Sequence, residues 1–199
     1  MSAAGSGGMP SPWARHDSRV ESIRGQLLIA GPGLFDPNFR RTVVLVGEHN
    51  EEGALGVVLN RPTAVSVGEA APALVTLVGE ESELFLGGPV QPQAAVLLAE
   101  LEHPELADLI VFDSIGFLIG DLEGKASEGI RRARAFAGYA GWGAGQLEGE
   151  LEAGGWIMES AFPEDVFTED PDRLWSAVLR RKGGEFAMLA TMPFDPSQN

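Results

Sequence analysis

The sequence predicts an α+β or layered α/β fold. Apolar runs of strand length follow one another along most of the chain, and segments with helical spacing are inserted between them. No linker-like stretch separates two such regions, so these elements are expected to form a single domain. A domain of 199 residues buries enough surface to fold without a disulfide or a structural metal.

Short apolar runs between turn residues indicate the first strands. Gln26–Ala30 is closed by Gly31-Pro32-Gly33, and residues 42–46 are apolar or β-branched at consecutive positions, as in a central strand covered on both faces. The polar residues 50–53 have the length of a hairpin loop. We therefore expect the apolar run at residues 54–59 to pair with the strand before it.

The middle of the chain adds a short helix and further strands. Ser66 and Glu69 have the spacing of a capping box, which predicts a helix start, and the helix should end near Pro72. Gly87-Gly88-Pro89-Val90 indicates a specialised turn, because glycine permits backbone angles that a Cβ forbids. Apolar stretches of strand length lie on both sides of this turn, at residues 83–86, 94–98, 109–112 and 116–119.

The last third of the chain mixes strands and helices. Residues 125–132 are polar and predict one or two helical turns, whereas residues 133–142 and 156–158 are typical of strands. A longer helix is predicted at residues 172–181, with an inward face formed by Leu174, Trp175, Val178 and Leu179.

Residues 146–153 predict another helix. Leu147 and Leu151 lie four positions apart and form one apolar stripe, while Glu148 and Glu152 are expected to point outward. Two glycines follow and should end the helix.

The charge of the chain argues against nucleic-acid binding. It has 29 acidic against 14 basic residues, a formal net charge of -15 and a pI near 4.5. Because nucleic-acid binding draws much of its affinity from neutralised phosphates, we expect no direct contact with DNA or RNA. The two basic runs, at residues 131–134 and 180–182, are interpreted as solvated faces. The absence of cysteine excludes thiol catalysis and Cys-based metal sites.

Residues 1–20 are expected to form a disordered N-terminal arm ahead of one domain at residues 21–199. They are rich in small residues and proline and lack the continuous apolar centre of a secretory signal. No apolar run reaches the roughly 18 residues of a membrane span. We therefore expect a cytoplasmic protein that does not contact a membrane.

Known catalytic and phosphate-binding motifs are not matched. Phe112-Asp113-Ser114-Ile115-Gly116 has Phe where the turn around a serine nucleophile needs a small residue. Residues 120–126 are one position short of a phosphate-binding loop, and residues 138–145 fit no register of a dinucleotide-binding motif. These patterns predict no catalytic residue, no cofactor and no metal.

Of the three histidines, His49 has the most informative position. It follows Glu48 at the end of a predicted buried strand, where an imidazole could act as a general base or respond to pH. Alternatively, it caps the strand by bonding a loop carbonyl. His16 and His103 lie in the N-terminal arm and in a predicted surface loop, and none of the three has metal-site spacing.

Several motifs occur in a fixed order from residue 25 to the end of the chain. They are Gly25-Gln26-Leu27-Leu28-Ile29-Ala30, Asp36-Pro37-Asn38-Phe39 with residues 43–46 and Glu48-His49, Gly53-Ala54-Leu55-Gly56 leading into Leu59-Asn60-Arg61-Pro62, Gly87-Gly88-Pro89-Val90 and Gly138-Tyr139-Ala140-Gly141-Trp142, the last followed by Gly145-Gln146-Leu147-Glu148 and Glu150-Leu151. In this order they resemble the YqgE/AlgH family of bacterial proteins.

The resemblance implies a compact mixed α/β domain with a barrel-like sheet and peripheral helices, and an activity that is largely unassigned. One branch of the family has been linked to the control of alginate production as a transcriptional regulator. This chain shows no helix-turn-helix pattern and has an acidic surface. A regulatory effect would therefore pass through a protein or a small molecule.

Polar and aromatic residues at the ends of predicted elements form the candidate ligand-binding set: Asn38, His49, Asn60, Arg61, Tyr139, Trp142, Gln146 and Glu150. In one interpretation they share a concave site, in which Arg61 binds an anionic group. Trp142 and Tyr139 would form an aromatic wall there, and Gln146 and Glu150 would supply hydrogen bonds. In the other interpretation they form a buried network in which Arg61 pairs with Glu150 or Glu48.

Two functions follow from these observations. The leading interpretation is a non-catalytic binding or regulatory module for an unidentified small molecule or protein, and self-association as a homo-oligomer is left open. The alternative is a small-molecule enzyme with His49 or Glu150 as general base and Arg61 as anion holder. An enzyme should have a pocket that contains His49, whereas a protein-binding module should have a broad apolar patch.

Overall fold

Ten strands form one sheet in the part of the chain that the structure, a computed structural model, describes: residues 21–120, 122 and 127–192. The strands are β1 (Gln26–Ala30), β2 (Val43–Asn50), β3 (Gly53–Val58), β4 (Pro62–Ser66), β5 (Glu83–Leu86), β6 (Val90–Leu101), β7 (Leu109–Phe112), β8 (Ile115–Leu118), β9 (Ile130–Gly143) and β10 (Trp156–Ser160). The helices are α1 (Val67–Ala70), α2 (Val75–Val78), α3 (Gln146–Glu152), α4 (Pro163–Val166), α5 (Pro171–Lys182) and α6 (Glu185–Leu189), with 3-10 turns at Pro72–Leu74 and Pro104–Leu106.

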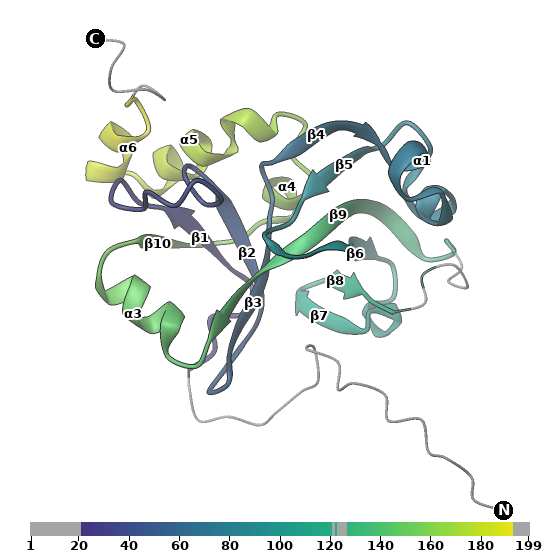
Figure 1. Cartoon of the computed structure of the whole chain (residues 1–199), viewed down its shortest axis with the longest axis horizontal. Coiled ribbons are helices and arrows are strands. Elements are labelled where there is room, and N and C mark those ends of the chain that lie inside the picture. The colour runs from purple at the N-terminus through teal and green to yellow at the C-terminus, as the bar shows by residue number, and fades with distance from the viewer. Residues whose placement is uncertain (1–20, 121, 123–126, 193–199) are drawn as a thin grey trace, which may run out of the picture.

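The sheet is mixed and open. Its main path is β10-β1-β2-β3-β9-β6-β8-β7, while β5 pairs with β9 and β4 pairs with β5 (Figure 1). The β5–β9 pair is parallel and the others are antiparallel. Because the path ends at β10 and β7 without a pairing between them in the described residues, the mixed α+β fold is confirmed but a barrel-like closure is not.

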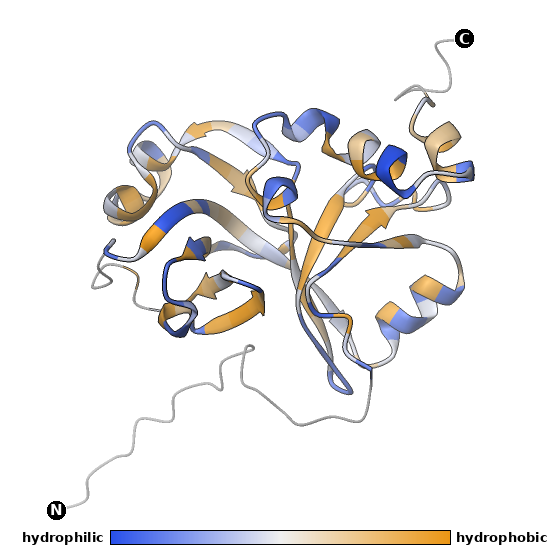
Figure 2. Cartoon of the chain, turned by 180° about the vertical axis from the view of Figure 1, so that it is seen from behind, coloured by the Kyte–Doolittle hydropathy of each residue, from blue (hydrophilic) through white to orange (hydrophobic). Residues whose placement is uncertain are grey.

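The strands β1, β2 and β3 bury both of their faces. Leu27 and its alternate neighbours face a large core cluster that α5 completes with Trp175. Leu28 and the residues between face a second cluster, which α3 covers with Leu147. Figure 2 shows these strands coloured as hydrophobic at the centre of the molecule. The consecutive apolar positions of the sequence thus mark strands enclosed between two layers of helices.

Most predicted elements are confirmed. The β2–β3 hairpin places Asn50 opposite Gly53. The capping box is present, because the Ser66 hydroxyl accepts from the Glu69 amide and the Glu69 carboxylate accepts from the Ser66 amide. The inward face of α5 is also confirmed, with Leu174, Trp175, Val178 and Leu179 all buried.

The helical turns predicted within residues 125–132 are wrong where the structure describes that segment. Ile130–Gly143 forms β9, and Arg132 lies opposite Glu100 of β6. The Arg132 guanidinium approaches the Glu100 carboxylate to 2.6 Å, so a cross-strand ion pair accounts for the polar character of the segment. Residues 125 and 126 lie outside the described residues.

The basic run that contains Arg134 contacts the fold more closely than a solvated face would. Arg134 donates to the carbonyl oxygens of Val166 and Thr168, both at 2.8 Å, and its guanidinium lies 4.3 Å from the centre of the Phe85 ring. Burial lowers the pKa of Arg134 to about 10. This arginine therefore joins β9 to the end of α4 and to the segment after it.

The second basic run covers the sheet edge at β10. Arg181 donates to the Ser160 carbonyl at 2.9 Å and also bonds the Asp165 carboxylate, and Lys182 donates to the Met158 carbonyl at 2.9 Å. Because β10 ends the main path of the sheet, these carbonyls would otherwise be open to another strand. The end of α5 thus occupies part of this edge.

Two further predictions concern segments that the structure does not describe. The N-terminal arm at residues 1–20 and the family-like ending at residues 195–199 both lie outside the described residues. Within the described part of the chain, no helix combines the length and the apolar character that crossing a bilayer requires.

The Gly87-Gly88 turn packs directly on the backbone of β9. Gly88 has a φ of +153°, and a Cβ placed on it would lie 2.2 Å from the carbonyl carbon of Tyr139. A Cβ on Gly87 would lie 2.2 Å from the carbonyl oxygen of Gly138. The close approach of the two backbones explains why glycine occupies both positions.

Replacing Gly88 with alanine should lower the free energy of unfolding by at least about 2 kcal/mol, because the new Cβ meets backbone that belongs to the sheet. The control is Gly149→Ala in α3, where a Cβ finds open space. That change should raise the free energy of unfolding by about 0.5–1 kcal/mol. Urea unfolding followed by circular dichroism measures both effects, and equal effects would contradict the close approach.

Candidate functional site

Helix α3 gathers part of the candidate set at the ends of β2, β9 and β10. It is bounded by two glycines with positive φ, Gly145 at 72° and Gly154 at 73°, which turn the chain away from β9 and towards β10. Leu147 is fully buried and anchors the helix on the cluster that contains Trp142. The polar side chains of α3 therefore lie against the strand ends.

The Glu150 carboxylate accepts hydrogen bonds from three side chains. Its Oε2 accepts from Nε1 of Trp142 at 2.9 Å and from Nε1 of Trp156 at 2.7 Å, and its Oε1 accepts from Nε2 of Gln146 at 2.9 Å. Gln146 also accepts from the Gly143 amide at 3.1 Å. Because both indoles are buried, Glu150 replaces the hydrogen bonds to water that their N–H groups lose on folding.

The aromatic wall around Trp142 differs from the predicted one. Trp142 and Trp156 meet edge to face with ring centres 5.9 Å apart, and Phe39 contacts both at 6.1 and 5.6 Å. Tyr139 belongs to the large core cluster instead. It lies three positions from Trp142 on β9, and residues separated by an odd number point to opposite faces of a strand. The predicted pairing of Trp142 with Tyr139 is therefore wrong.

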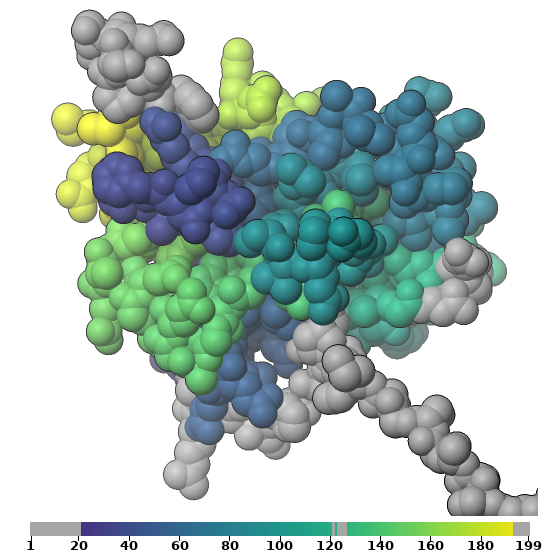
Figure 3. Space-filling view, in the orientation of Figure 1, coloured from purple at the N-terminus to yellow at the C-terminus, as the bar shows by residue number. Residues whose placement is uncertain are grey.

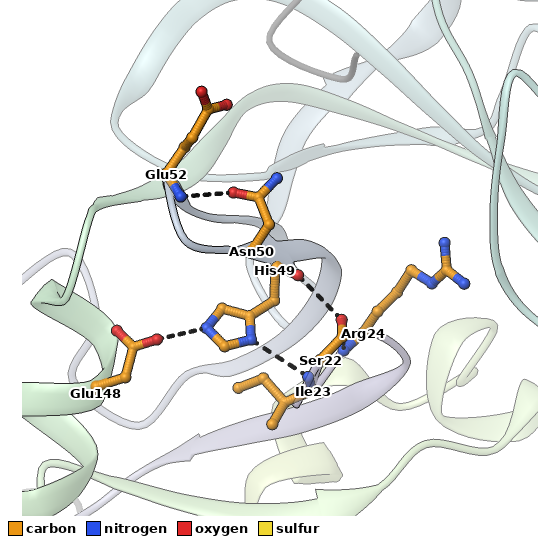
Figure 4. Close-up of polar contacts among 7 residues, drawn as sticks. All are labelled: Ser22, Ile23, Arg24, His49, Asn50, Glu52 and Glu148. Carbon is orange, nitrogen blue, oxygen red and sulfur yellow. Dashed lines mark hydrogen bonds and ion pairs between the residues drawn. The ribbon is translucent and has the colours of Figure 1, made fainter. Parts of the chain in front are cut away.

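His49 joins β2 to α3 and to the segment before β1. Its Nε2 lies 2.7 Å from Oε1 of Glu148, and its Nδ1 accepts from the Ile23 amide at 3.3 Å (Figure 4). The His49 carbonyl accepts from the Ser22 hydroxyl at 3.1 Å. Since a backbone amide can only donate, Nδ1 carries the lone pair and Nε2 carries the proton. The lone pair that a general base would use is thus already engaged.

Glu148 does not simply point outward as predicted. It faces His49, and its second oxygen, Oε2, is buried without a hydrogen-bond partner among the described residues. Hydrogen bonding to its own backbone amide, and then to His49, lowers the pKa of Glu148, and these effects outweigh the opposing effect of burial. Glu148 therefore stays ionised to a lower pH than an ordinary glutamate.

Asn60 and Arg61 lie at a second location, where β3 meets the loop between β1 and β2. Asn60 is buried, accepts from the Val43 amide at 2.8 Å and donates to the Arg41 carbonyl at 2.9 Å. Arg61 donates to the Arg40 carbonyl at 2.5 Å. The side chains of Asn60 and Arg61 thus hold the end of this loop against β3.

Positive charge gathers at this second location. Burial lowers the pKa of Arg61, and the negative charge of Asp172 partly opposes that effect. Burial and the charge of Arg40 lower the pKa of Arg41, whose guanidinium lies 4.6 Å from the centre of the Trp175 ring. Arg41 also donates to the Met192 carbonyl. Figure 3 shows the purple surface of the early chain beside the yellow surface of α6.

The candidate set therefore divides between locations and does not share one site. His49, Trp142, Gln146 and Glu150 lie around α3, and Asn60 and Arg61 lie beside the β1–β2 loop, while Tyr139 is in the core. Asn38 is exposed in that loop, and its backbone amide donates to the Asp36 carboxylate in the predicted turn. Among the described residues, Arg61 forms no ion pair with Glu150 or Glu48, so that part of the alternative network is also wrong.

Three cavities can be compared with the positions of the candidate bases. One of about 170 Å³ at the β2–β3 hairpin includes Trp142, and another of about 460 Å³ includes His103. An apolar groove of about 580 Å³ runs between β10 and α6 and includes Met158 and Phe186. None of these three is lined by His49, Glu150 or Arg61. In the described residues, no group of three or more acidic or histidine side chains is arranged to hold a metal.

Sequence reasoning missed three residues that complete the α3 location: Phe39, Glu148 and Trp156. Trp156 follows α3 closely, and an indole needs an acceptor when buried, so its position offered a usable signal. The contact of Glu148 with His49 spans 99 positions in the sequence and had no local signal.

Replacing Glu150 with alanine should lower the free energy of unfolding by about 3 kcal/mol, because two buried indole N–H groups lose their acceptor. Glu152→Ala is the matched control on the same helix, since Glu152 is exposed, and its effect should stay within about 0.5 kcal/mol. Urea unfolding measures both variants. A Glu150→Ala variant as stable as the control would contradict the bonding role of Glu150.

Glu148 should make stability depend on pH in the acidic range. Its folded pKa lies below the unfolded value, so its ionised form stabilises the fold above the unfolded pKa. This contribution is lost as the pH falls through the folded pKa. The stability difference between the natural chain and Glu148→Gln should therefore shrink as the pH falls below about 4.5, the ordinary value for glutamate. Unfolding curves at several pH values measure it, and a constant difference would contradict the assignment.

Comparisons with known proteins match most of the chain to the same group of proteins. A model of the AlgH-like family matches residues 27–187. A UPF0301 protein of Streptomyces coelicolor is 46% identical over 191 residues, which cover 92% of this chain and 98% of that protein. A UPF0301 protein of Mycobacteroides abscessus is 43% identical over 186 residues, which cover 88% and 87% of the two chains.

Solved structures agree with this result. The crystal structure of DIP2367 from Corynebacterium diphtheriae superposes with a TM-score of 0.75 at 28% identity, covering 84% of this chain and 91% of that one. The solution structure of the AlgH protein from Pseudomonas aeruginosa gives a TM-score of 0.65 at 28% identity, with coverages of 90% and 98%. The chain therefore belongs to the YqgE/AlgH family, which its ordered sequence motifs resemble.

Proposed function

We propose that this protein is a non-catalytic binding or regulatory module and that its ligand presents an anionic group to Arg61. The observation that carries the proposal is a difference in hydrogen bonding between the candidate bases and Arg61. His49 and Glu150 have their acceptor atoms engaged by neighbouring donors. Arg61 has a single hydrogen bond and no ion pair among the described residues.

The state of the two candidate bases supports a role without catalysis. A general base needs a free lone pair within reach of a substrate proton. The Nδ1 lone pair of His49 accepts from Ile23, and both oxygens of Glu150 accept from side chains of the fold. Using His49 as a base would first require breaking its contact with the segment before β1, and protonating Glu150 would weaken the contacts that hold α3. The enzyme alternative would thus weaken contacts that stabilise the fold, whereas ligand binding at Arg61 would not.

The surroundings of Arg61 support an anionic ligand. A guanidinium carries five N–H donors, and its planar shape matches carboxylate and phosphate groups. Arg61 is partly buried, so its charge has lost part of its hydration, and this burial lowers its pKa. An anion would compensate for that loss. The ligand could be a small molecule or a group on a protein, and the net charge of -15 argues against a nucleic acid.

A regulatory role would follow from such binding, with the bound molecule or protein as the signal. No cofactor, metal or membrane is part of the proposal, and the cytoplasmic location stays a prediction. Self-association as a homo-oligomer is compatible with it.

A thermal-shift screen tests the proposal with inorganic phosphate, carboxylic acids, nucleotides and divalent metals as probes. A ligand at about 100 times its Kd stabilises the native state by roughly 2.7 kcal/mol, which raises Tm by about 5–10 °C for a chain of this size. The shift should disappear in Arg61→Ala.

The matched control is Arg173→Ala, because Arg173 is an exposed arginine whose ion pair lies within the first turn of α5. It should keep the full shift. A ligand that still binds Arg61→Ala would overturn the role of Arg61. Turnover of a bound ligand that is lost in His49→Gln or Glu150→Gln would instead favour the enzyme alternative.

A further inference from the structure

His49 is held between two elements that approach it from opposite sides. Glu148 of α3 bonds Nε2, and Ile23 bonds Nδ1 (Figure 4). Ile23 belongs to the segment Ser22–Arg24, here called the N-terminal strap. Ser22 adds a bond from its hydroxyl to the His49 carbonyl. The His49 side chain is only 4% exposed, so water cannot readily replace either ring contact.

The ring fits between these elements only in its neutral form. The Ile23 amide needs a lone pair on Nδ1, whereas a doubly protonated imidazole has an N–H group at both nitrogens. Protonation would set the Nδ1 proton against the Ile23 amide proton, at a position where 3.3 Å separates the two nitrogens. The contact on the strap side would change from attractive to repulsive.

We propose that His49 is a pH-sensitive latch: when its ring takes up a proton, the N-terminal strap detaches from β2, while the ring remains bonded to Glu148 on α3. The two sides of the ring respond in opposite directions. On the Glu148 side, a hydrogen bond from a neutral ring to a carboxylate becomes an ion pair between two charged groups, which is stronger.

Glu148 is suited to hold the charged ring. Its lowered pKa keeps the carboxylate ionised in the pH range where histidine side chains take up protons. Its Oε2 is buried without a hydrogen-bond partner among the described residues, so a positive charge nearby reduces an existing electrostatic cost. The His49–Glu148 contact therefore tightens under the conditions that loosen the strap.

Other charged groups near His49 are placed differently. From β3, the residue opposite His49 is Ala54, which has no charge. The side chains of Arg24 and Glu52 extend away from the ring in Figure 4. Glu48, the adjacent residue on β2, has an interaction of its own. At the strap, Arg24 carries a positive charge and the exposed Glu21 carries a negative one.

Release of the strap would leave the sheet in place. The Gly25 amide bonds the Val46 carbonyl, and β1 pairs with β2 and β10 beyond it. Ile23, in contrast, packs on the side of the cluster that α3 covers. Opening the latch would therefore uncover apolar surface beside α3 without unfolding the domain.

NMR of the full chain tests the latch. Two-bond ¹H–¹⁵N spectra should show the Nε2–H tautomer of His49 near neutral pH. The second observable is the protection of the Ile23 amide against hydrogen exchange, relative to its intrinsic exchange rate. As the pH falls from about 8 to about 5, the range in which histidines titrate, this protection should fall by about five- to tenfold. A loss of that size is expected for one lost hydrogen bond. The change in Ile23 protection should follow the titration of the His49 ring and not that of exposed His103.

Two variants separate the latch from a general effect of acid. His49→Gln does not titrate, so its Ile23 protection should not change over this range. In Glu148→Gln the protonated ring loses its partner charge, so the Ile23 transition should move to lower pH. A proton on Nδ1 at neutral pH, or an Ile23 amide that ignores the His49 titration, would overturn the proposal. The titration of the natural chain decides the question even if His49→Gln does not fold.

Discussion

The burial of both faces of β1, β2 and β3 is the constraint on which the remaining structure depends. A strand that is apolar on consecutive positions must be covered on two sides, and here α5 covers one side and α3 the other. Once α3 is seated by Leu147, its polar positions are fixed against the ends of three strands. The contacts of Glu148 and Glu150 follow from that packing.

The polar contacts of α3 affect the free energy of folding in different ways. Glu150 supplies acceptors to two indole donors that are buried in any case, so its main effect is to remove a cost of folding. Glu148 meets a single ring whose protonation state can change. One carboxylate therefore accepts from donors that are always present in the fold, while the other faces a ring whose charge can change.

Local patterns in the sequence were sufficient for most elements. Period-2 alternation and apolar runs predicted the strands, and the capping box at Ser66 predicted α1, because these signals depend on neighbours in the chain. The start of β9 was mistaken for part of a helical segment, since its arginines are polar for a reason that lies on another strand, at Glu100. Closure of the sheet likewise depends on long-range pairing, and no local pattern reports it.

The candidate site was harder to predict than the fold. Its residues were grouped by their place in the ordered motifs as much as by geometry. Trp142 and Tyr139 could have been separated from sequence alone, because three positions along a strand reverse the face. The contacts of His49 with Ile23 and Glu148 could not, since they join segments 26 and 99 positions away. Such contacts become visible only when packing places the segments.

The two locations differ in what a ligand would have to displace. At α3, the acceptor atoms of His49 and Glu150 are already bonded within the fold, so a ligand that used them would compete with stabilising contacts. At Arg61, the guanidinium has given up hydration and gained one carbonyl bond, with Asp172 as the nearby negative charge that offsets its burial. A partly desolvated cation gains from an external anion, because the anion replaces part of the hydration that the cation has lost. Binding at this location would therefore add interactions without removing any that hold the sheet.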